Sequence, residues 1–281
     1  MTTPRVSIVI PNFNYGRYLE RAISSVIQQP IDVECMVLDG GSTDESVAII
    51  KRYAPYLSYW RSERDGGHVA AISEGFRRAE GSILGWLNSD DFLAPNALCR
   101  IVEAFERNPS AVAVSGRCIL VDANDRPFKA SRPIIRDWRR MIQSGHGLSQ
   151  MSTFWTRQAY LDVGGLDESL TFSFDFDLFV RLSQHGQIVA IQDYISMFRW
   201  HSIAKSSTLQ AVGLEDNSKI SMRYRGKPIS HFWHRLNPTS RVINGILWAL
   251  DKKRISEIVE SATIRPVLAS KIGLKETPYS T

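Results

Sequence analysis

The sequence has little cysteine and no long apolar run. Three cysteines occur among 281 residues, Cys35, Cys99 and Cys118, and no two have Cys-x-x-Cys spacing. So few, in odd number, argue against a disulfide framework and against a structural zinc site. No stretch approaches the roughly 18 apolar residues of a membrane-spanning helix. Residues 1–5 also lack the basic and apolar regions of a secretory signal, so we expect a cytoplasmic protein.

Acidic residues are scarce in the last part of the chain. The net charge is +5, and from Ser202 onward 13 Lys and Arg face 6 Asp and Glu, so the excess lies in this tail. The tail lacks the alternation of aromatic and basic residues that stacks on bases, so nucleic acid is disfavoured as a partner. Two interpretations stay open. The tail either packs on the rest of the protein, or lies peripherally on an anionic membrane through 252–254 beside 246–248.

Strand and helix signals alternate through the first half of the chain. Apolar runs predict strands, and apolar positions at helical spacing predict the helices between them. Such alternation is typical of an α/β fold with a mostly parallel sheet and helices on both faces. Ser42 and Glu45 have the spacing of a capping box for the second helix. The expected strands are Val6–Ile10, Val33–Leu38, Leu57–Arg61 and Ile83–Leu87, and the helices are 16–29, 42–53, 67–79 and 95–107.

The pattern loosens beyond residue 110. We expect short strands and loops that cover a site, then helices, then further strands, and a mostly helical tail from residue 206. The expected later strands are 111–115, 119–121, 188–191 and 195–200, and the later helices are 156–163 and 175–185.

Polar, glycine-rich loops follow each of the first four strands. Parallel strands deliver such loops to one edge of a sheet, where α/β proteins bind ligands. Asp90 and Asp91 end the fourth strand, and adjacent carboxylates repel unless a cation or hydrogen-bond donors lie between them. Mg²⁺ or Mn²⁺ held together with substrate phosphates would relieve that repulsion. A solvated pair that caps the helix near Pro95 is the alternative.

Five segments in this order resemble family 2 glycosyltransferases of the GT-A fold, of the bacterial surface-polysaccharide type. The resemblance covers about residues 5–205. It implies a catalytic domain over 1–205, with a nucleotide-sugar half (1–115) and an acceptor half (116–205), followed by a basic helical extension (206–281). The segments are Val6–Asn14, Asp39–Asp44, Asp65–Ile72, Gly85–Asp91, and Gly164–Glu168 with Asp175–Phe179.

The resemblance also implies roles for individual residues. Asp175 would be the catalytic base, and Asp91 would ligate Mn²⁺ or Mg²⁺ with His201 nearby. A base takes the acceptor proton while a cation stabilises the leaving diphosphate, so no covalent nucleophile is needed. The implied reaction is an inverting transfer from a nucleotide sugar (UDP, GDP or dTDP) to a saccharide or lipid-linked acceptor. The implied nucleotide-binding residues are Pro11, Asn12, Phe13, Asp39, Gly40, Asp65, Gly66 and Asp90.

The sequence departs from the family pattern at three places. Gly40 stands where many members carry an acid that pairs with uracil, which puts a uridine donor in doubt. Phe174 precedes Asp175 where the family has glutamate, and Arg199-Trp200 lacks the glutamine of processive synthases. A processive polymer synthase is therefore not expected.

Two other functions stay open as alternatives. A nucleotidyltransferase that makes the sugar nucleotide has a similar fold, but such enzymes usually open with Gly-x-Gly-Thr-Arg, where this chain has Pro11-Asn12-Phe13-Asn14. A non-catalytic nucleotide-binding relative would keep the fold without the chemistry. Asp175 in the first turn of a helix is also favourable for the helix dipole alone, without any catalytic role.

Overall fold

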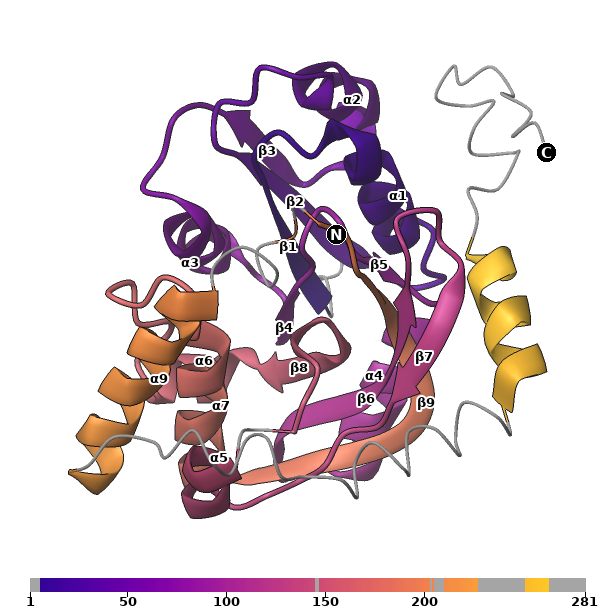
Figure 1. The fold of residues 1–281 in the computed structure, drawn as a ribbon. Coiled ribbons are helices and arrows are strands. Elements are labelled where there is room, and N and C mark those ends of the chain that lie inside the picture. The colour runs from indigo at the N-terminus through magenta and orange to yellow at the C-terminus, as the bar shows by residue number, and fades with distance from the viewer. Residues whose placement is uncertain (1–5, 145–146, 203, 205–209, 227–250, 263–281) are drawn as a thin grey trace.

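Nine strands form one sheet in the computed structural model, which describes residues 6–144, 147–202, 204, 210–226 and 251–262. The order across the sheet is β3-β2-β1-β4-β8-β6-β9-β5, with β7 added to β6 (Figure 1). The strands are β1 Val6–Asn12, β2 Val33–Asp39, β3 Tyr59–Ser62, β4 Ile83–Trp86, β5 Phe92–Leu93, β6 Ala111–Val121, β7 Pro127–Ser131, β8 Thr153–Thr156 and β9 Gln187–Arg199.

Helices separate most of these strands along the chain. Two short 3₁₀ helices, Ala54–Tyr56 and Gln150–Ser152, lie among them. A further helix covers residues 251–261. The α-helices are α1 Gly16–Ile27, α2 Ser46–Tyr53, α3 His68–Arg78, α4 Ala97–Arg107, α5 Trp138–Ser144, α6 Arg157–Asp162, α7 Phe174–His185 and α9 Gln210–Arg225.

The first four strands run parallel, as the sequence predicts. β1 pairs with β2 on one side and β4 on the other, and β2 pairs with β3. Beyond β4 the sheet is mixed, because β8 is antiparallel to both β4 and β6, whereas β6 and β9 are parallel. The loops that follow β1, β2, β3 and β4 therefore leave from one edge, the carboxyl edge of the sheet.

Both faces of the sheet are buried, which explains the unbroken apolar runs of its strands. Ile8 and Ile10 of β1 point into one core with α1, α2, α4 and the helix over 251–261. Val9 points into the other core, with α3, α5, α6 and α7. Alternate side chains of a strand face opposite sides, so one apolar strand supplies both cores.

Three expectations about the elements are corrected. The separate short strands expected over 111–121 and 188–200 are the long strands β6 and β9, whose pairing continues across irregularities near Ser115–Arg117. The helix expected from Pro95 begins at Ala97. The capping box is absent because α2 begins at Ser46 without a side-chain cap, and the hydroxyl of Ser42 instead donates to Asp39.

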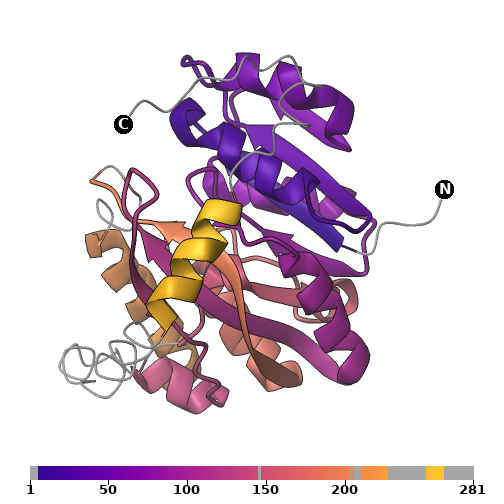
Figure 2. The same ribbon diagram turned by 90° about the vertical axis from the view of Figure 1, so that its right-hand side faces the viewer.

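The described parts of the C-terminal region pack on the sheet domain. Figure 1 shows α9 beside α6 and α7, and Figure 2 shows the 251–261 helix lying across β6 and β9. Asp251 accepts hydrogen bonds from Arg117 and Tyr194, and Ile255 is fully buried. No described helix is long and apolar enough to cross a membrane. Residues 246–248 of the membrane interpretation lie outside the described residues, so that contact stays a prediction.

Candidate active site

The loop after β2 is organised around a buried carboxylate, that of Asp39. Asp39 has no exposed surface and accepts hydrogen bonds from Asn12, from the hydroxyl and backbone N–H of Ser42, from Ser62 and from the N–H of Gly41. Burial raises its pKa, but the bonds from Ser42, Ser62 and Asn12 outweigh burial and leave the pKa below its ordinary value. Asp39 therefore joins the ends of β1, β2 and β3.

Gly40 lies between two other residues that the sequence assigns to the nucleotide. A Cβ at this position would be 3.4 Å from the ring of Phe13 and 3.5 Å from Oδ1 of Asp65. Phe13 is 59% exposed, although Pro11 and Asn12 directly before it are buried. An exposed aromatic face beside a residue without a side chain provides a surface on which a flat base can stack.

Arg61 connects the third loop to this surface. Its guanidinium donates to the carbonyl of Asp39 at 2.9 Å and to the carboxylate of Asp65 at 3.0 Å, and its Nε donates to Glu74 at 2.8 Å. Asp65 in turn accepts from the N–H of Gly67 at 2.8 Å. Gly66 is exposed between them. The nucleotide-assigned residues Asp39 and Asp65, in the second and third loops, are thus joined by one buried arginine.

The acidic pair after β4 divides into a buried and a partly exposed carboxylate. Asp91 is 1% exposed and accepts from the backbone N–H of Arg199 at 2.9 Å and from Asn88 at 3.3 Å. Burial, and then the charge of Asp90, raise the pKa of Asp91 well above its ordinary value. Asp90 keeps 14% of its side chain exposed. The cap alternative is not what the structure shows, since Asp91 bonds to β9 rather than to α4.

His201, which follows β9, lies at the same edge of the sheet. Its Nε2 lies 3.0 Å from Oδ2 of Asp90. The imidazole ring packs against Tyr15 and Tyr18, with centroids 5.8 and 5.1 Å away. The sequence places His201 beside Asp91, but the structure pairs it with Asp90, because the N–H of Arg199 turns the Asp91 carboxylate inward.

The donor atoms at this edge fit a divalent cation that substrate also ligates. Among the described residues, no three His, Cys, Asp or Glu side chains converge into a metal site. The edge offers the Asp90–His201 pair, Asp91 behind it, and a buried amide oxygen of Asn88 for which the described structure provides no hydrogen-bond partner. Mg²⁺ and Mn²⁺ are commonly held by one or two carboxylates and completed by phosphates. These residues suit that arrangement and not a cation held by protein alone.

Asp175 reaches the same edge from α7. It lies in the first turn, and its neighbour Phe174 packs against Trp86 at the end of β4 and against His68 at the start of α3, each at 5.6 Å between centroids. The Asp175 carboxylate is partly exposed and, within the described part of the chain, accepts a hydrogen bond from the N–H of Phe176. Asp177, two positions on, is fully buried. Asp175 is therefore the acid of this helix that faces outward beside the loops.

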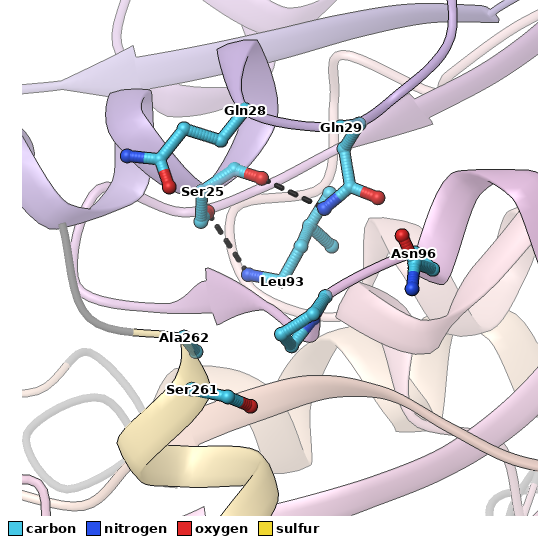
Figure 3. A pocket seen from close by; sticks show the side chains of 8 residues that line it. Ser25, Gln28, Gln29, Leu93, Asn96, Ser261 and Ala262 are labelled. Atoms are coloured by element: carbon cyan, nitrogen blue, oxygen red, sulfur yellow. Dashed lines mark hydrogen bonds between the residues drawn. The ribbon is translucent and has the colours of Figure 1, made fainter. Parts of the chain in front are cut away.

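A small cavity elsewhere in the molecule is not part of this edge. It lies between the end of α1, the segment after β5 and residues 261–262, and it is lined by polar side chains such as Ser25 and Gln29 (Figure 3). The 12 residues of α1 span about 18 Å and separate it from Gly16, where α1 begins at the carboxyl edge. Gln29 and Ser25 already bond to the chain there. The cavity marks a junction between elements.

The geometry matches what comparison with known proteins shows. The model of the family described as glycosyl transferase family 2 matches residues 7–161, which is more than half of the chain. The chain belongs to glycosyl transferase family 2. Chondroitin synthase of Escherichia coli is 30% identical over 190 residues, which cover 65% of this chain and 27% of that enzyme. An uncharacterised glycosyltransferase of Mycobacterium tuberculosis is 26% identical over 245 residues, covering 83% and 91% of the two chains.

Another relative, an uncharacterised Nostoc glycosyltransferase, is 36% identical over 126 residues. Those residues cover 43% of this chain and 39% of the relative. The chain thus spans less than half the length of this relative and of chondroitin synthase. What those whole proteins act on therefore bears on this family 2 member only as a proposal.

Solved structures share the fold. Staphylococcus aureus TarS 1–349 in complex with UDP-GlcNAc aligns with a TM-score of 0.56 and 16% identity, over 73% of this chain and 61% of TarS. The mannosyltransferase PcManGT of Pyrobaculum calidifontis, in complex with GDP-Man and Mn²⁺, aligns with a TM-score of 0.59 and 16% identity, over 99% and 78%. The predicted GT-A fold is confirmed, and glycosyl transfer is favoured over nucleotidyl transfer.

The structure brings the sequence-assigned residues to one edge, and it adds others that the sequence did not indicate. Arg199 is 2% exposed, donates to the carbonyl of Asp90 and pairs with Asp125. Asp125 also pairs with Arg21 of α1. Asp125 lies in a polar turn where the sequence carries no sign of a site, so only its position in space indicates that it supports the acidic pair.

Proposed function

We propose that this family 2 glycosyltransferase moves a sugar, with inversion, from a nucleotide-sugar donor to a hydroxyl of a saccharide or lipid-linked acceptor, in the synthesis of a bacterial surface polysaccharide. One observation carries the proposal. Asp175, the Asp90–His201 pair and the loop residues Phe13 and Asp65 all lie along the carboxyl edge of one sheet. That is where α/β folds bind nucleotides.

On the donor side, the base lies against Phe13 over Gly40. Asp65 lies next to Gly40, so its carboxylate is the one nearest to the edge of that base. Asp39 does not contact the base in this proposal. Its carboxylate oxygens accept hydrogen bonds from the surrounding loops and hold those loops in place. The complexes of the two structural neighbours, with UDP-GlcNAc and with GDP-Man, support either uridine or guanosine as the nucleoside.

The diphosphate lies at the acidic pair in this proposal. Asp90 and His201 face the diphosphate. Asp91 is buried behind them and holds the turn by accepting the backbone N–H of Arg199. This differs from the family resemblance, which implies that Asp91 ligates the cation, since Asp90 is the more exposed of the pair. A bound Mn²⁺ or Mg²⁺ would supply positive charge to the leaving diphosphate.

On the acceptor side, Asp175 takes the proton of the attacking hydroxyl. Its carboxylate lies partly exposed in the first turn of α7, where the helix dipole favours a negative charge. An oxygen that is losing its proton attacks the anomeric carbon opposite the diphosphate, which inverts the configuration in one step.

The role of Asp175 is tested by Asp175→Asn. The donor is found first, by thermal shift with UDP-, GDP- and dTDP-sugars, with and without Mn²⁺. We expect turnover of that donor to fall about 10²- to 10⁴-fold, since a positioned base contributes that much. Nucleotide affinity, measured by calorimetry, should stay unchanged. Asp193→Asn, an identical change at an exposed site, is the control. Retained turnover in Asp175→Asn would show that another group is the base.

The role of Asp90 is tested by Asp90→Asn together with calorimetry. We expect affinity for UDP or GDP to fall about tenfold or more in Mn²⁺ and little in EDTA, because the lost charge faces the cation and its diphosphate. Asp193→Asn, which makes the same change in charge away from the acidic pair, is again the control. Equal losses with and without Mn²⁺ would contradict a cation at this carboxylate.

A further inference from the structure

The segment that precedes Asp175 is held by a residue far along the chain. Asp216 of α9 is 2% exposed, and its Oδ2 accepts the backbone N–H groups of Thr171, Phe172 and Ser173 at 2.9, 2.7 and 3.2 Å. Three consecutive amides directed at one carboxylate oxygen form an anion-binding turn whose anion is part of the protein. The carboxylate therefore fixes the backbone conformation that leads into α7.

Packing at the same point leaves this segment little freedom. The hydroxyl of Ser173 donates to the carbonyl of Gly213, and a Cβ at Gly213 would lie 2.6 Å from the ring of Phe172. A side chain at residue 213 would therefore push α9 away from the segment. The close approach places Asp216 within hydrogen-bond reach of all three amides.

A second contact holds α9 against α7. Arg223 donates to the buried carboxylate of Asp177 at 3.0 Å and to Asp167 at 2.7 Å. Asp177 also pairs with Arg181 within α7. Asp177 and the segment 171–173 lie on either side of Asp175, so α9 holds the chain before and after it. Asp216 makes its contact with the segment whose ordering decides where α7 begins.

We propose that Asp216 is a positioning residue for the transfer reaction, and that the catalytic unit includes α9 rather than ending near residue 205. The proposal rests on the proposed function, in which Asp175 is the base. Asp216 touches no substrate. It sets the start of α7, and a base displaced by about 1 Å loses of order 10²-fold in rate even when substrate binds normally.

The test compares Asp216→Asn with Glu215→Gln in the full chain. Glu215 directly precedes Asp216 in α9. It is exposed, and among the described residues it pairs only with Lys219. The measurements are release of UDP or GDP from the donor with water as acceptor, calorimetric affinity for the nucleotide, and hydrogen exchange of the 171–173 amides. Asp216→Asn keeps the size of the side chain and one carbonyl acceptor, so the fold should persist.

For Asp216→Asn we expect kcat to fall about 10- to 100-fold. Nucleotide affinity and donor KM should stay within about twofold, and the 171–173 amides should exchange faster. Glu215→Gln should change none of these. Unchanged kcat would overturn the proposal, whether or not the amides exchange faster. A parallel loss of nucleotide affinity, which marks general unfolding, would also overturn it.

The Asp175→Asn result separates this proposal from the proposed function. If Asp175→Asn abolishes turnover and Asp216→Asn does not reduce it, only the positioning role is wrong. If Asp175→Asn retains turnover, the assignment of the base is wrong, and Asp216 has no catalytic residue to position.

Discussion

The two sides of the active-site edge are held in different ways. On the nucleotide side, Asp39 bonds to residues of its own loop and of the neighbouring strand ends, all within 27 positions of it. On the acceptor side, the segment before Asp175 depends on Asp216, more than 40 positions away on α9. The surface assigned to the nucleotide base is thus formed by nearby sequence, and the acceptor side is completed only when α9 has folded onto it.

This difference predicts different consequences of mutation. Loss of a central residue on the donor side should disturb the sheet edge itself, and so lower global stability. Loss of a contact on the acceptor side should loosen one segment while the sheet and the nucleotide surface persist. Local opening of part of a structure below the free energy of global unfolding is common where few contacts hold a segment.

The largest stability effect that we expect is that of Asp39→Ala. The variant leaves several buried donors without an acceptor, at roughly 1–3 kcal/mol each where water does not replace it, so the free energy of unfolding should fall by roughly 3 kcal/mol or more. Urea unfolding measures this. Asp193→Ala, which removes an exposed partner of Arg100, should stay within about 0.5 kcal/mol of wild type.

The same variant has a defined pH dependence. The folded-state pKa of Asp39 lies below its unfolded value, so its contribution is present above about pH 4 and is lost as pH falls through the folded pKa. The stability difference between wild type and Asp39→Ala should therefore narrow at acid pH. A stability difference that widens on acidification would contradict this prediction. If Asp216→Asn were less stable than Asp39→Ala at neutral pH, the two sides would not differ in their effect on global stability.

The sequence predicted the first four strands and the edge where their loops meet, because the signals there are local. Each of the first four strands is an apolar run followed at once by its polar loop, so Phe13, Asp39, Asp65 and Asp90 could be placed on one edge from strand order alone. Because β1, β2, β3 and β4 pair in parallel, the loops that follow them lie at the same edge of the sheet. The ends of individual elements were less well predicted, as Ser42 shows.

The residues that support the acidic pair and the segment before Asp175 carry no such signal. Asp216 and Arg223 belong to an ordinary polar helix sequence, and Asp125 belongs to a polar turn. Their roles depend on contacts across 43 to 104 positions with backbone amides, carboxylates and arginines, which no periodicity encodes. For the same reason the division between Asp90 and Asp91 could not be predicted, since it depends on which carboxylate the N–H of Arg199 reaches.

Adjacent glycines of the second loop give the smallest effects and the finest test of the donor side. Gly41 has φ +83°, and a Cβ there would lie 3.2 Å from the N of Arg64, so Gly41→Ala should cost about 1–2 kcal/mol of stability. Gly40 has no such φ, and a Cβ would make ordinary contacts with Phe13 and Asp65. Gly40→Ala should therefore unfold like wild type but bind UDP or GDP several-fold more weakly, because the methyl group occupies the surface assigned to the base. Thermal unfolding and calorimetry separate the two, and nucleotide affinity unchanged in Gly40→Ala would place the base elsewhere.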